Sequence, residues 1–436
     1  MNKAFQGMLV AFIVAIIGYF MAGIYFEPIH ARLIGVVVFL VTLWTNEALP
    51  LGVVSLLPII LFPALDILST SATTVNYSKS IIFLFLGGFL LAIAVEKIGL
   101  HKVIANKLLN IFPASSRGII FALAITSAFL SSLLSNTTTA LLLMPIALFL
   151  TDIKALKIRF VLAIAYGASI GGIVTPIGTP PNLILMGFLQ DNNLETLTFI
   201  TWMFKTLPLA AIMLTIVPYV LSLGATGYSV ENTIEAKELS RDQKKLLYIL
   251  GSLVVVLFVN SFFKVSEAGI LLGYGLLMMV PSIGFLTWED SKKIPFEIMF
   301  LFGAGFSIAA AFGGTGLAEA ISKLLLGLTE LSPILLIMIV AALITFTTEV
   351  TSNTALISIA LPIIYALGTA ANLDTNLILM VATICASYAF MLPIATPPNA
   401  IAMSSKVLAI KDMAKYGILF NILAILSTTA IALLWW

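Results

Sequence analysis

Apolar stretches of about 20 residues recur along the whole chain and are separated by short polar segments. In a helix, a stretch of about that length spans the hydrocarbon core of a bilayer. The pattern predicts crossings near 7–26, 31–47, 51–64, 81–98, 159–189, 199–223, 244–263, 267–286, 296–324, 376–405 and 414–434. We therefore expect an all-α polytopic membrane protein with about 11 transmembrane helices.

Two further apolar stretches, 117–150 and 333–367, are too short for two comfortable crossings with a turn between them. Each has Ser-Asn-Thr near its middle. Polar, non-helical backbone at membrane depth is tolerated only where protein or a water-filled cavity surrounds it. We expect each stretch to form a re-entrant hairpin, which enters and leaves the membrane on the same side.

The second half of the chain repeats the first half at a constant offset. Ser-Asn-Thr occurs at 135–137 and again at 352–354, and Thr-Pro-Pro-Asn occurs at 179–182 and again at 396–399, in both cases 217 positions later. The offset predicts an extra N-terminal helix at 1–30, a first repeat at 31–223, a cytoplasmic linker at 224–243 and a second repeat at 244–436. Each repeat then holds one hairpin (117–150 or 333–367) and one broken helix (159–189 or 376–405). Because each repeat has an odd number of crossings, the second repeat should be inverted relative to the first.

Composition supports a membrane location and sets the orientation. Apolar residues make up 61% of the chain and charged residues only 10%, which is too few to cover a water-soluble protein of 436 residues. The net charge is +2 with no long basic tract, so nucleic acid is not an expected partner. The single cysteine, Cys385, excludes an intramolecular disulfide. On this map 17 of the 22 Lys and Arg residues share the side of the N-terminus. The positive-inside rule then predicts a cytoplasmic N-terminus. The length of the chain and its lack of soluble domains favour a bacterial inner (plasma) membrane location.

The paired motifs have the chemistry of an ion and anion site. Prolines close together break a helix, which leaves carbonyl groups at the end of one half-helix and amide N–H groups at the start of the next. The carbonyl end favours a cation, and the amide end favours an anion. A lone Ser-Asn-Thr in an apolar run is more often a packing feature. Two matched pairs of such segments favour a shared binding site instead.

Missing residue types also limit the function. No Lys or Arg falls near the predicted centre, and the clearly intramembrane carboxylate is Glu349, whose repeat equivalent is Ser132. A structural role for Glu349 is favoured, with cation binding or proton transfer as the alternative. No Ser-His-Asp or metal-ligand cluster is present, so an enzyme is not expected. Glycines at 87–88, 303, 305 and 313–314 predict close helix packing or, alternatively, a surface along which helices slide.

At these paired motifs the chain resembles the divalent anion/sodium symporter (DASS) family over nearly its whole length. The most specific part is the paired motifs, with Thr-Glu-Val-Thr-Ser-Asn-Thr at 348–354 similar to the family's second signature. The resemblance implies hairpin tips at each Ser-Asn-Thr, a homodimer, and an elevator motion of a transport domain against a scaffold.

The resemblance also implies which residues bind substrate and ions. Substrate carboxylates would contact Asn136, Thr137, Thr179, Ser352, Asn353, Thr354, Thr396 and Pro397. One sodium ion would bind near Ser131, Ser135, Asn136 and Gly178, and another near Thr348, Thr351, Asn353 and Ala395. A dicarboxylate brings about two negative charges into a site without basic residues, so co-bound cations are the natural compensation. Oxygen-rich turns suit Na⁺ better than a transition metal.

The leading hypothesis is therefore sodium-coupled symport of a C4-dicarboxylate such as succinate, malate or fumarate. Alternatives with the same architecture are a sodium-independent dicarboxylate exchanger and a transporter of sulfate or another inorganic anion. A cation/proton antiporter or an arsenite-type efflux protein belongs to a different class, and an antiporter should show a cluster of intramembrane carboxylates. A channel is disfavoured because two opposed hairpins suit alternating access better than a continuous pore.

Overall fold

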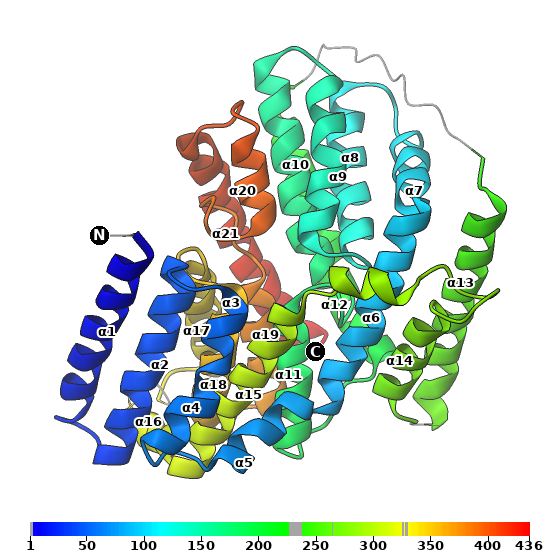
Figure 1. Ribbon diagram of the computed structural model, residues 1–436. Helices are drawn as coiled ribbons and strands as arrows, with labels where there is room; N and C mark the ends of the chain where they lie inside the picture. Colours follow the sequence, from blue (N-terminus) through cyan, green and yellow to red (C-terminus); the bar gives the residue numbers. More distant parts are fainter. Residues whose placement is uncertain (1–2, 226–237, 264, 325–326, 328–329) are drawn as a thin grey trace. The chain divides into compact units, whose positions relative to one another are not determined.

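The computed structural model describes residues 3–225, 238–263, 265–324, 327 and 330–436, and its regular elements are helices (Figure 1). The helices of the first half are α1 (Lys3–Ala22), α2 (Pro28–Asn46), α3 (Leu51–Leu56), α4 (Pro58–Ala64), α5 (Thr70–Thr74), η1 (Val75–Ser78), α6 (Ser80–Ile98), α7 (Leu100–Leu109), α8 (Ser116–Ser131), α9 (Asn136–Phe149), α10 (Lys154–Gly172), α11 (Pro180–Asp191) and α12 (Phe199–Ser222). Those of the second half are α13 (Arg241–Phe263), α14 (Glu267–Leu277), η2 (Trp288–Lys293), α15 (Phe296–Thr315), α16 (Leu317–Leu324), α17 (Pro333–Thr348), α18 (Asn353–Ala370), α19 (Thr375–Ala386), α20 (Pro397–Ser404) and α21 (Ile410–Leu434).

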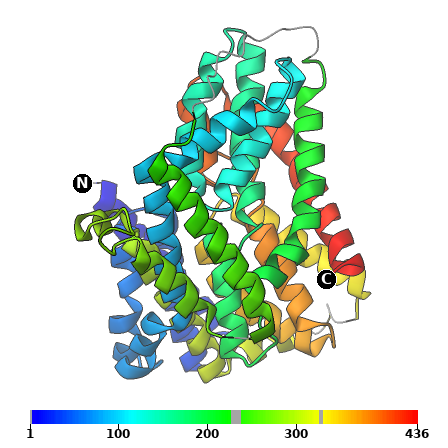
Figure 2. The same ribbon diagram turned by 90° about the vertical axis from the view of Figure 1, so that its right-hand side faces the viewer.

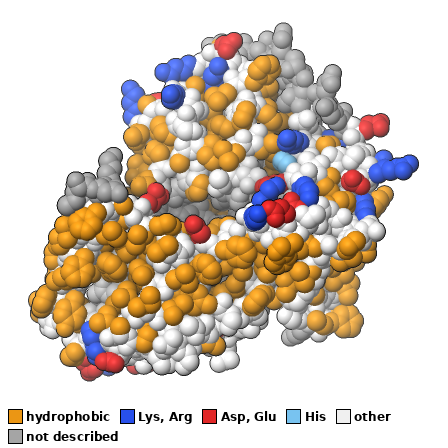
Figure 3. Space-filling view, in the orientation of Figure 1, with side chains coloured by type: hydrophobic (Ala, Val, Ile, Leu, Met, Phe, Trp, Pro, Cys, Tyr) orange, Lys and Arg blue, Asp and Glu red, His pale blue; other side chains and the backbone are white. Residues whose placement is uncertain are grey.

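Eight helical segments of the described residues are long and apolar enough to cross a membrane: α1, α2, the segment Thr70–Ile98, α10, α12, α15, α18 and α21. Six shorter apolar helical segments of 10–17 residues accompany them, including α8, α9 and α17 of the two predicted hairpins. Figure 3 shows hydrophobic side chains over much of one face, whereas charged side chains gather in a few places. The all-helical polytopic class agrees with the prediction, and the count of 11 crossings stays a prediction.

Three predicted crossings differ from the observed helices. The segment 296–324 is divided at Gly316, whose φ of 75° is left-handed and ends α15. The prediction of one crossing over 267–286 is wrong at its C-terminal end, because α14 stops at Leu277. After it the chain turns back, and the Met278 carbonyl accepts hydrogen bonds from Phe285 N and Leu286 N, both at 2.7 Å. The segment 51–64 is two helices that meet at Leu57.

Of the predicted linker 224–243, residues 226–237 lie outside the described residues, and α13 already begins at Arg241.

The helix order repeats at the offset found in the sequence. The helices α8 and α17 begin at residues 116 and 333 and end at 131 and 348, which is 217 positions apart at both ends. The helices α9 and α18 begin at Asn136 and Asn353, and Gly99 and Gly316 have nearly the same φ, 70° and 75°. The duplicated sequence therefore folds into the same succession of helices twice. The assignment of the two repeats as domains stays a prediction.

The chain forms two compact units that each contain segments of both repeats. Unit 1 comprises residues 1–82, 183–196 and 295–386, and unit 2 comprises 83–182, 197–294 and 387–436. The core of unit 1 lies among α2, α3, α4 and α15, with Leu33, Leu40 and Phe62 fully buried. A close approach of α15 to η1 needs Gly303, where a Cβ atom would lie 2.1 Å from the Tyr77 ring.

Unit 2 is built around α10, which is buried along most of its length and packs against α8. At Gly167 and Gly171 the backbones of α10 and α8 approach so closely that a Cβ atom would lie 2.4 Å from Ala124 O or 2.0 Å from Ala128 O. At Gly87, a Cβ atom on α6 would lie 2.3 Å from the Leu271 carbonyl oxygen of α14. Close packing thus accounts for Gly87, as it does for Gly303 in unit 1, whereas Gly313 faces open space.

A charged contact in unit 2 lies on the short helix η2, outside the predicted crossings. The Lys97 ammonium donates a hydrogen bond to Asp290 Oδ2 at 2.7 Å, and Thr287 N donates to the same oxygen. The Lys97 hydrogen bond, together with that from Thr287 N, lowers the pKa of Asp290 to about 2. The carboxylate therefore stays ionised at neutral pH and keeps η2 paired with the end of α6.

The two tryptophans after α21 donate hydrogen bonds to α12, and one of them replaces a donor that a proline removes from that helix. Residue 208 is a proline, so the Phe204 carbonyl lacks its i+4 amide donor. The Trp435 indole N–H donates to Phe204 O at 3.0 Å, and the Trp436 indole N–H donates to Lys205 O at 2.8 Å. The C-terminal end of α21, red in Figure 2, is therefore tied to α12.

Replacing both Trp435 and Trp436 by phenylalanine should lower the melting temperature of the purified protein. Each indole hydrogen bond contributes about 1 kcal/mol, so the double variant should lose about 2 kcal/mol. Melting in detergent measures the change, with Trp288→Phe as the control because Trp288 is 81% exposed. A double variant that melts like the control would contradict the expectation.

Candidate functional site

The first Ser-Asn-Thr sequence forms the start of α9, in unit 2. Ser135 is the N-cap: it has extended backbone, and its hydroxyl accepts a hydrogen bond from Thr138 N at 3.1 Å. Ser131, at the end of α8, donates its hydroxyl hydrogen bond to Asn136 Oδ1. The side chains at the end of α8 and the start of α9 are thus joined across a short turn.

The second Ser-Asn-Thr sequence has the same geometry, in unit 1. Ser352 is the N-cap of α18, and its hydroxyl accepts from Ala355 N at 3.5 Å. Thr348 Oγ1 lies 2.6 Å from Asn353 Oδ1 and 3.0 Å from Ala386 O. Since Thr348 and Asn353 lie 217 positions after Ser131 and Asn136, the hydroxyl–amide pair is duplicated as well as the sequence.

Both predicted breaks occur at the Thr-Pro-Pro-Asn sequences. The helix α10 ends at Gly172 and α11 begins at Pro180, while α19 ends at Ala386 and α20 begins at Pro397. Thr396 is the N-cap of α20, and its hydroxyl accepts from Asn399 N at 3.4 Å. The chain is therefore non-helical over 173–179 and 387–396, as the prolines predict.

An asparagine fastens each break, and sequence reasoning did not single it out as a site residue. Asn182 Nδ2 donates to the carbonyls of Gly172 at 3.0 Å and Thr175 at 2.9 Å. The equivalent Asn399 Nδ2 donates to the carbonyls at 389 and 392, at 2.9 and 3.0 Å. Both asparagines are fully buried, and neither Oδ1 atom has a hydrogen-bond partner among the described residues. The sequence signal that could have found these asparagines is their position at the end of both Thr-Pro-Pro-Asn sequences, 217 positions apart.

Within unit 2 the turn between α8 and α9 lies next to the break between α10 and α11. A Cβ atom at Gly172 would lie 3.0 Å from Asn136 Oδ1 and 3.4 Å from Thr179 Cβ. A Cβ atom at Gly178 would lie 2.5 Å from Gly172 O, so the loop folds back on the end of α10. The second motif contributes as well, because α20 packs against α9 and α10 in the same unit.

The predicted site residues fall into two groups. Unit 2 contains Ser131, Ser135, Asn136, Thr137, Gly178, Thr179, Ala395, Thr396 and Pro397. Unit 1 contains Thr348, Thr351, Ser352, Asn353 and Thr354. Of the first group, Ser131, Asn136, Gly178 and Thr179 are brought together as described above. Their assignment to substrate or sodium stays a prediction.

Side-chain exposure separates the predicted ligands. Ser131, Thr179 and Thr348 are buried, whereas Asn136 and Asn353 are half-buried at their turns. Ser135 is exposed, and its hydroxyl donates to Thr138 Oγ1 at 2.9 Å. The carboxamides of Asn136 and Asn353 are therefore partly accessible at the two turns.

Glu349, which sequence reasoning considered as a cation or proton group, is buried and 2% exposed. Its repeat equivalent Ser132 is also buried, and the Ser132 carbonyl accepts a hydrogen bond from Thr175 Oγ1 at 2.5 Å. The position therefore lies inside the protein at the hairpin turn of both repeats.

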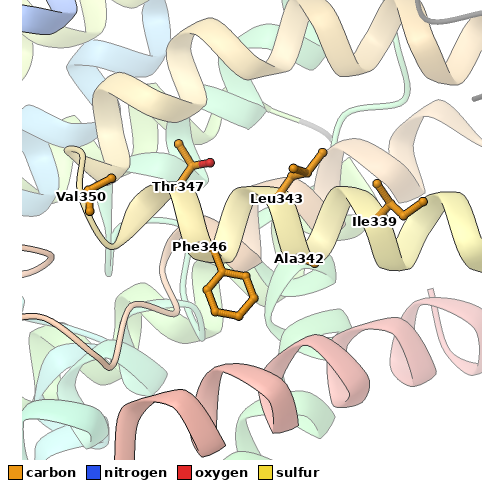
Figure 4. A pocket seen from close by; sticks show the side chains of 6 residues that line it. All are labelled: Ile339, Ala342, Leu343, Phe346, Thr347 and Val350. Atoms are coloured by element: carbon orange, nitrogen blue, oxygen red, sulfur yellow. The ribbon is translucent and has the colours of Figure 1, made fainter. Parts of the chain in front are cut away.

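An apolar groove runs along α17 and has different chemistry from the turns (Figure 4). It is lined by Ile339, Ala342, Leu343, Phe346, Thr347 and Val350. A single hydroxyl group in this lining gives little to hold a charged ligand. A site for an anion is better served by the polar turns and helix N-termini.

Comparison with known families agrees with the transporter-like geometry. A family model described as "Citrate transporter" matches residues 36–385, which is more than half of the chain. The chain belongs to the citrate transporter family. The membership makes it a multi-pass membrane protein and a transporter rather than an enzyme, as the sequence predicted.

Curated relatives are similar over nearly the full length. The sodium-dependent dicarboxylate transporter SdcS of Staphylococcus saprophyticus is 31% identical over 470 residues, which cover 97% of this chain and 91% of the relative. SdcS of Staphylococcus aureus is 31% identical over 463 residues, covering 96% of this chain and 89% of the relative. The resemblance inferred from the paired motifs is thereby confirmed.

Two solved structures share the fold. MtrF of Neisseria gonorrhoeae, from a class described as antimetabolite efflux pumps, matches with a TM-score of 0.62 and 12% identity, covering 84% of this chain and 83% of that one. The YdaH transporter of Alcanivorax borkumensis matches with a TM-score of 0.59 and 13% identity, covering 84% and 86%. At such low identity these matches concern the fold alone.

Proposed function

We propose that this protein is a secondary transporter that couples the movement of sodium ions to the uptake of a dicarboxylate. The observation that carries the proposal is the full-length similarity to relatives named sodium-dependent dicarboxylate transporters. The paired turns and breaks give the proposal a physical basis, because they supply oxygen ligands and amide donors without any basic side chain among the predicted ligands.

The first sodium ion would bind between the turn after α8 and the first break. Ser131 Oγ, Asn136 Oδ1 and the Gly178 carbonyl are neutral oxygen donors, the ligand type that a hard cation prefers. These residues lie together in unit 2, where Asn136 Oδ1 faces Gly172 and Gly178 folds back on the same glycine. Ser135 lies at the same turn. The second ion would use Thr348, Thr351, Asn353 and Ala395, of which all but Thr351 lie 217 positions after a residue of the first set.

The substrate carboxylates would bind at the helix N-termini. The helices α9 and α18 begin at Asn136 and Asn353, and α20 begins just after Thr396. At α9 and α18 the N–H groups without intrahelical partners and the helix dipole favour a negative charge, whereas α20 opens with two prolines and offers the dipole and the backbone at Pro397. The hydroxyls of Thr137, Thr179, Ser352 and Thr354 would supplement these groups. Partial charges alone do not neutralise a dicarboxylate, so the two sodium ions complete the electrostatic balance.

The proposed function also needs a particular arrangement of the crossings and repeats in the membrane. We infer about 11 crossings in two inverted repeats, with re-entrant hairpins at 117–150 and 333–367 and the N-terminus in the cytoplasm of a bacterial cell. A homodimer that moves its transport domain in an elevator motion fits the same scheme. Alternating access then requires both hairpins to reach the site from opposite sides of the bilayer.

Uptake of labelled succinate into proteoliposomes tests the function. With an inward sodium gradient, uptake should exceed that with choline in place of sodium at least tenfold, since the anion site lacks its compensating charges without sodium. Equal uptake in choline would refute sodium coupling and favour an exchanger. Sulfate uptake in the absence of any succinate uptake would refute the dicarboxylate assignment.

A further inference from the structure

The carbonyl groups of residues 172–175, at the end of α10 and just after it, have hydrogen-bond donors, and two of the donors come from α12. The last carbonyls of a helix lack intrahelical partners and need other donors when they are buried. The amide of Asn182 reaches the first and last of four successive carbonyls, those of Gly172 and Thr175. The two between them, at 173 and 174, accept from Trp202 Nε1 at 2.9 Å and Thr206 Oγ1 at 3.2 Å.

Trp202 and Thr206 are placed for this by their spacing on α12. Residues four apart lie on the same face of a helix, and both side chains are fully buried within unit 2. The Thr206 hydroxyl also lies 3.0 Å from Trp202 O and 3.4 Å from Met203 O, so its single proton is shared between its own helix and Val174 O. The contact of both side chains with the break belongs to the buried packing of α12.

The carbonyls that follow in the loop have no comparable local donors. The residues four positions after Pro176 and Ile177 are Pro180 and Pro181, which have no N–H group. Asn182 N, four positions after Gly178, donates to Thr179 O at 3.2 Å. Donors thus occupy the carbonyls of 172–175, whereas the next two carbonyls have no amide donor four positions later.

We propose that Trp202 and Thr206 are positioning residues for the first sodium site. By holding the carbonyls at 173 and 174, α12 sets the course of the loop and thereby the distance from the Gly178 carbonyl to Asn136 Oδ1. The inference rests on the proposed sodium coupling and adds residues that contact neither ion nor substrate.

The second break is supported by different groups, so the effect should be confined to one ion site. There Phe390 N donates to Asn421 Oδ1 at 3.3 Å, and Asn421 belongs to α21. At Gly417 the helix α21 approaches Phe390 O so closely that a Cβ atom would lie 2.2 Å from that oxygen. The asparagine brace, Asn182 and Asn399, is common to both breaks.

Substituting Trp202→Phe and Thr206→Val tests the proposal, because each change removes a donor. Thr206→Val keeps the shape of the side chain, whereas Trp202→Phe also removes buried ring volume. We expect the sodium concentration for half-maximal uptake to rise about tenfold, as for groups that orient metal ligands. The KM for succinate at saturating sodium should change less than twofold. Thr206→Ser, which keeps the hydroxyl, should restore the sodium affinity.

Matched controls come from the same helix and the same residue types. Thr215 donates its hydroxyl to Ala211 O at 2.8 Å within α12 and does not reach the break, so Thr215→Val should leave sodium affinity unchanged. Trp288→Phe removes an exposed indole and should also have no effect.

Half-maximal stabilisation of the purified protein by NaCl, with choline chloride as reference, gives a second readout that does not depend on transport. If both variants fold and their half-maximal sodium concentrations are unchanged, the proposal is overturned. It is also overturned if the half-maximal sodium concentration and the KM for succinate rise equally and Thr206→Ser does not reverse the change. If Trp202→Phe does not fold, the comparison of Thr206→Val with Thr206→Ser decides. Sodium-dependent stabilisation of the wild type without sodium-dependent uptake would instead refute the proposed function.

Discussion

Replacing Asn136 or Asn353 by alanine should reduce sodium-dependent succinate uptake at least about a hundredfold. Each asparagine is the first residue of a helix and is only half-buried. Its side-chain oxygen accepts a hydrogen bond from the hydroxyl of Ser131 or Thr348. In the proposed site each serves a sodium ion through Oδ1 and a substrate carboxylate through its N–H groups. Losing two charge-assisted interactions of about 1.5–3 kcal/mol each corresponds to a hundredfold or more.

The measurement is initial uptake rate at equal amounts of reconstituted protein, with melting temperature as the check on folding. Asn192→Ala is the control, since Asn192 is exposed and bonds only to the preceding turn of its own helix among the described residues. Because the geometry is duplicated, the two alanine variants should fail to a similar extent. A folded Asn136→Ala protein with normal uptake would remove that residue from the site.

The largest expected effect on folding is that of Gly171→Val. A Cβ atom there would lie 2.0 Å from Ala128 O and 2.4 Å from Ala128 Cα, and these are backbone atoms that cannot rotate away. Together with Gly167 against Ala124, the contact is a small-xxx-small pairing of α10 with α8. Separating the helices would move the end of α10 away from the first turn, so the loss of stability should exceed about 3 kcal/mol.

Size-exclusion profiles and melting temperatures in detergent would measure this loss. Gly251→Val is the matched control, because no atom lies within 4 Å of the corresponding Cβ on α13. We expect the control to give wild-type yield, whereas Gly171→Val should give aggregated or no protein. A monodisperse Gly171→Val protein with a wild-type melting temperature would show that the two helices are not held at this distance.

Local chemistry explains why the breaks and caps were predictable from the sequence. A proline pair removes backbone donors wherever it stands, so breaks were predicted at Pro180–Pro181 and Pro397–Pro398, which are the first residues of α11 and α20. Serine before a helix caps it through its own backbone geometry, as Ser135 and Ser352 do. These effects act within a few residues and do not depend on the rest of the fold.

Predictions that depended on apolar length alone were less accurate. An apolar run does not reveal that Gly316 will take a left-handed backbone and divide a span into α15 and α16. Nor does it show that α14 ends at Leu277, because the residues after it are as apolar as those before. Helix ends of this kind are set by packing and by turn hydrogen bonds to Met278 rather than by hydropathy.

By itself, the sequence determined the membrane class, the duplication, the breaks and the residue types of the site, because each depends on local composition or on a repeated spacing. Only the tertiary structure decided which side chains donate to the carbonyls of the first break. Their donors Trp202 and Thr206 lie about thirty residues further along the chain, on a helix whose sequence shows no sign of that contact. The partner of a buried carbonyl is chosen by which helix packs over it, and that choice is not local.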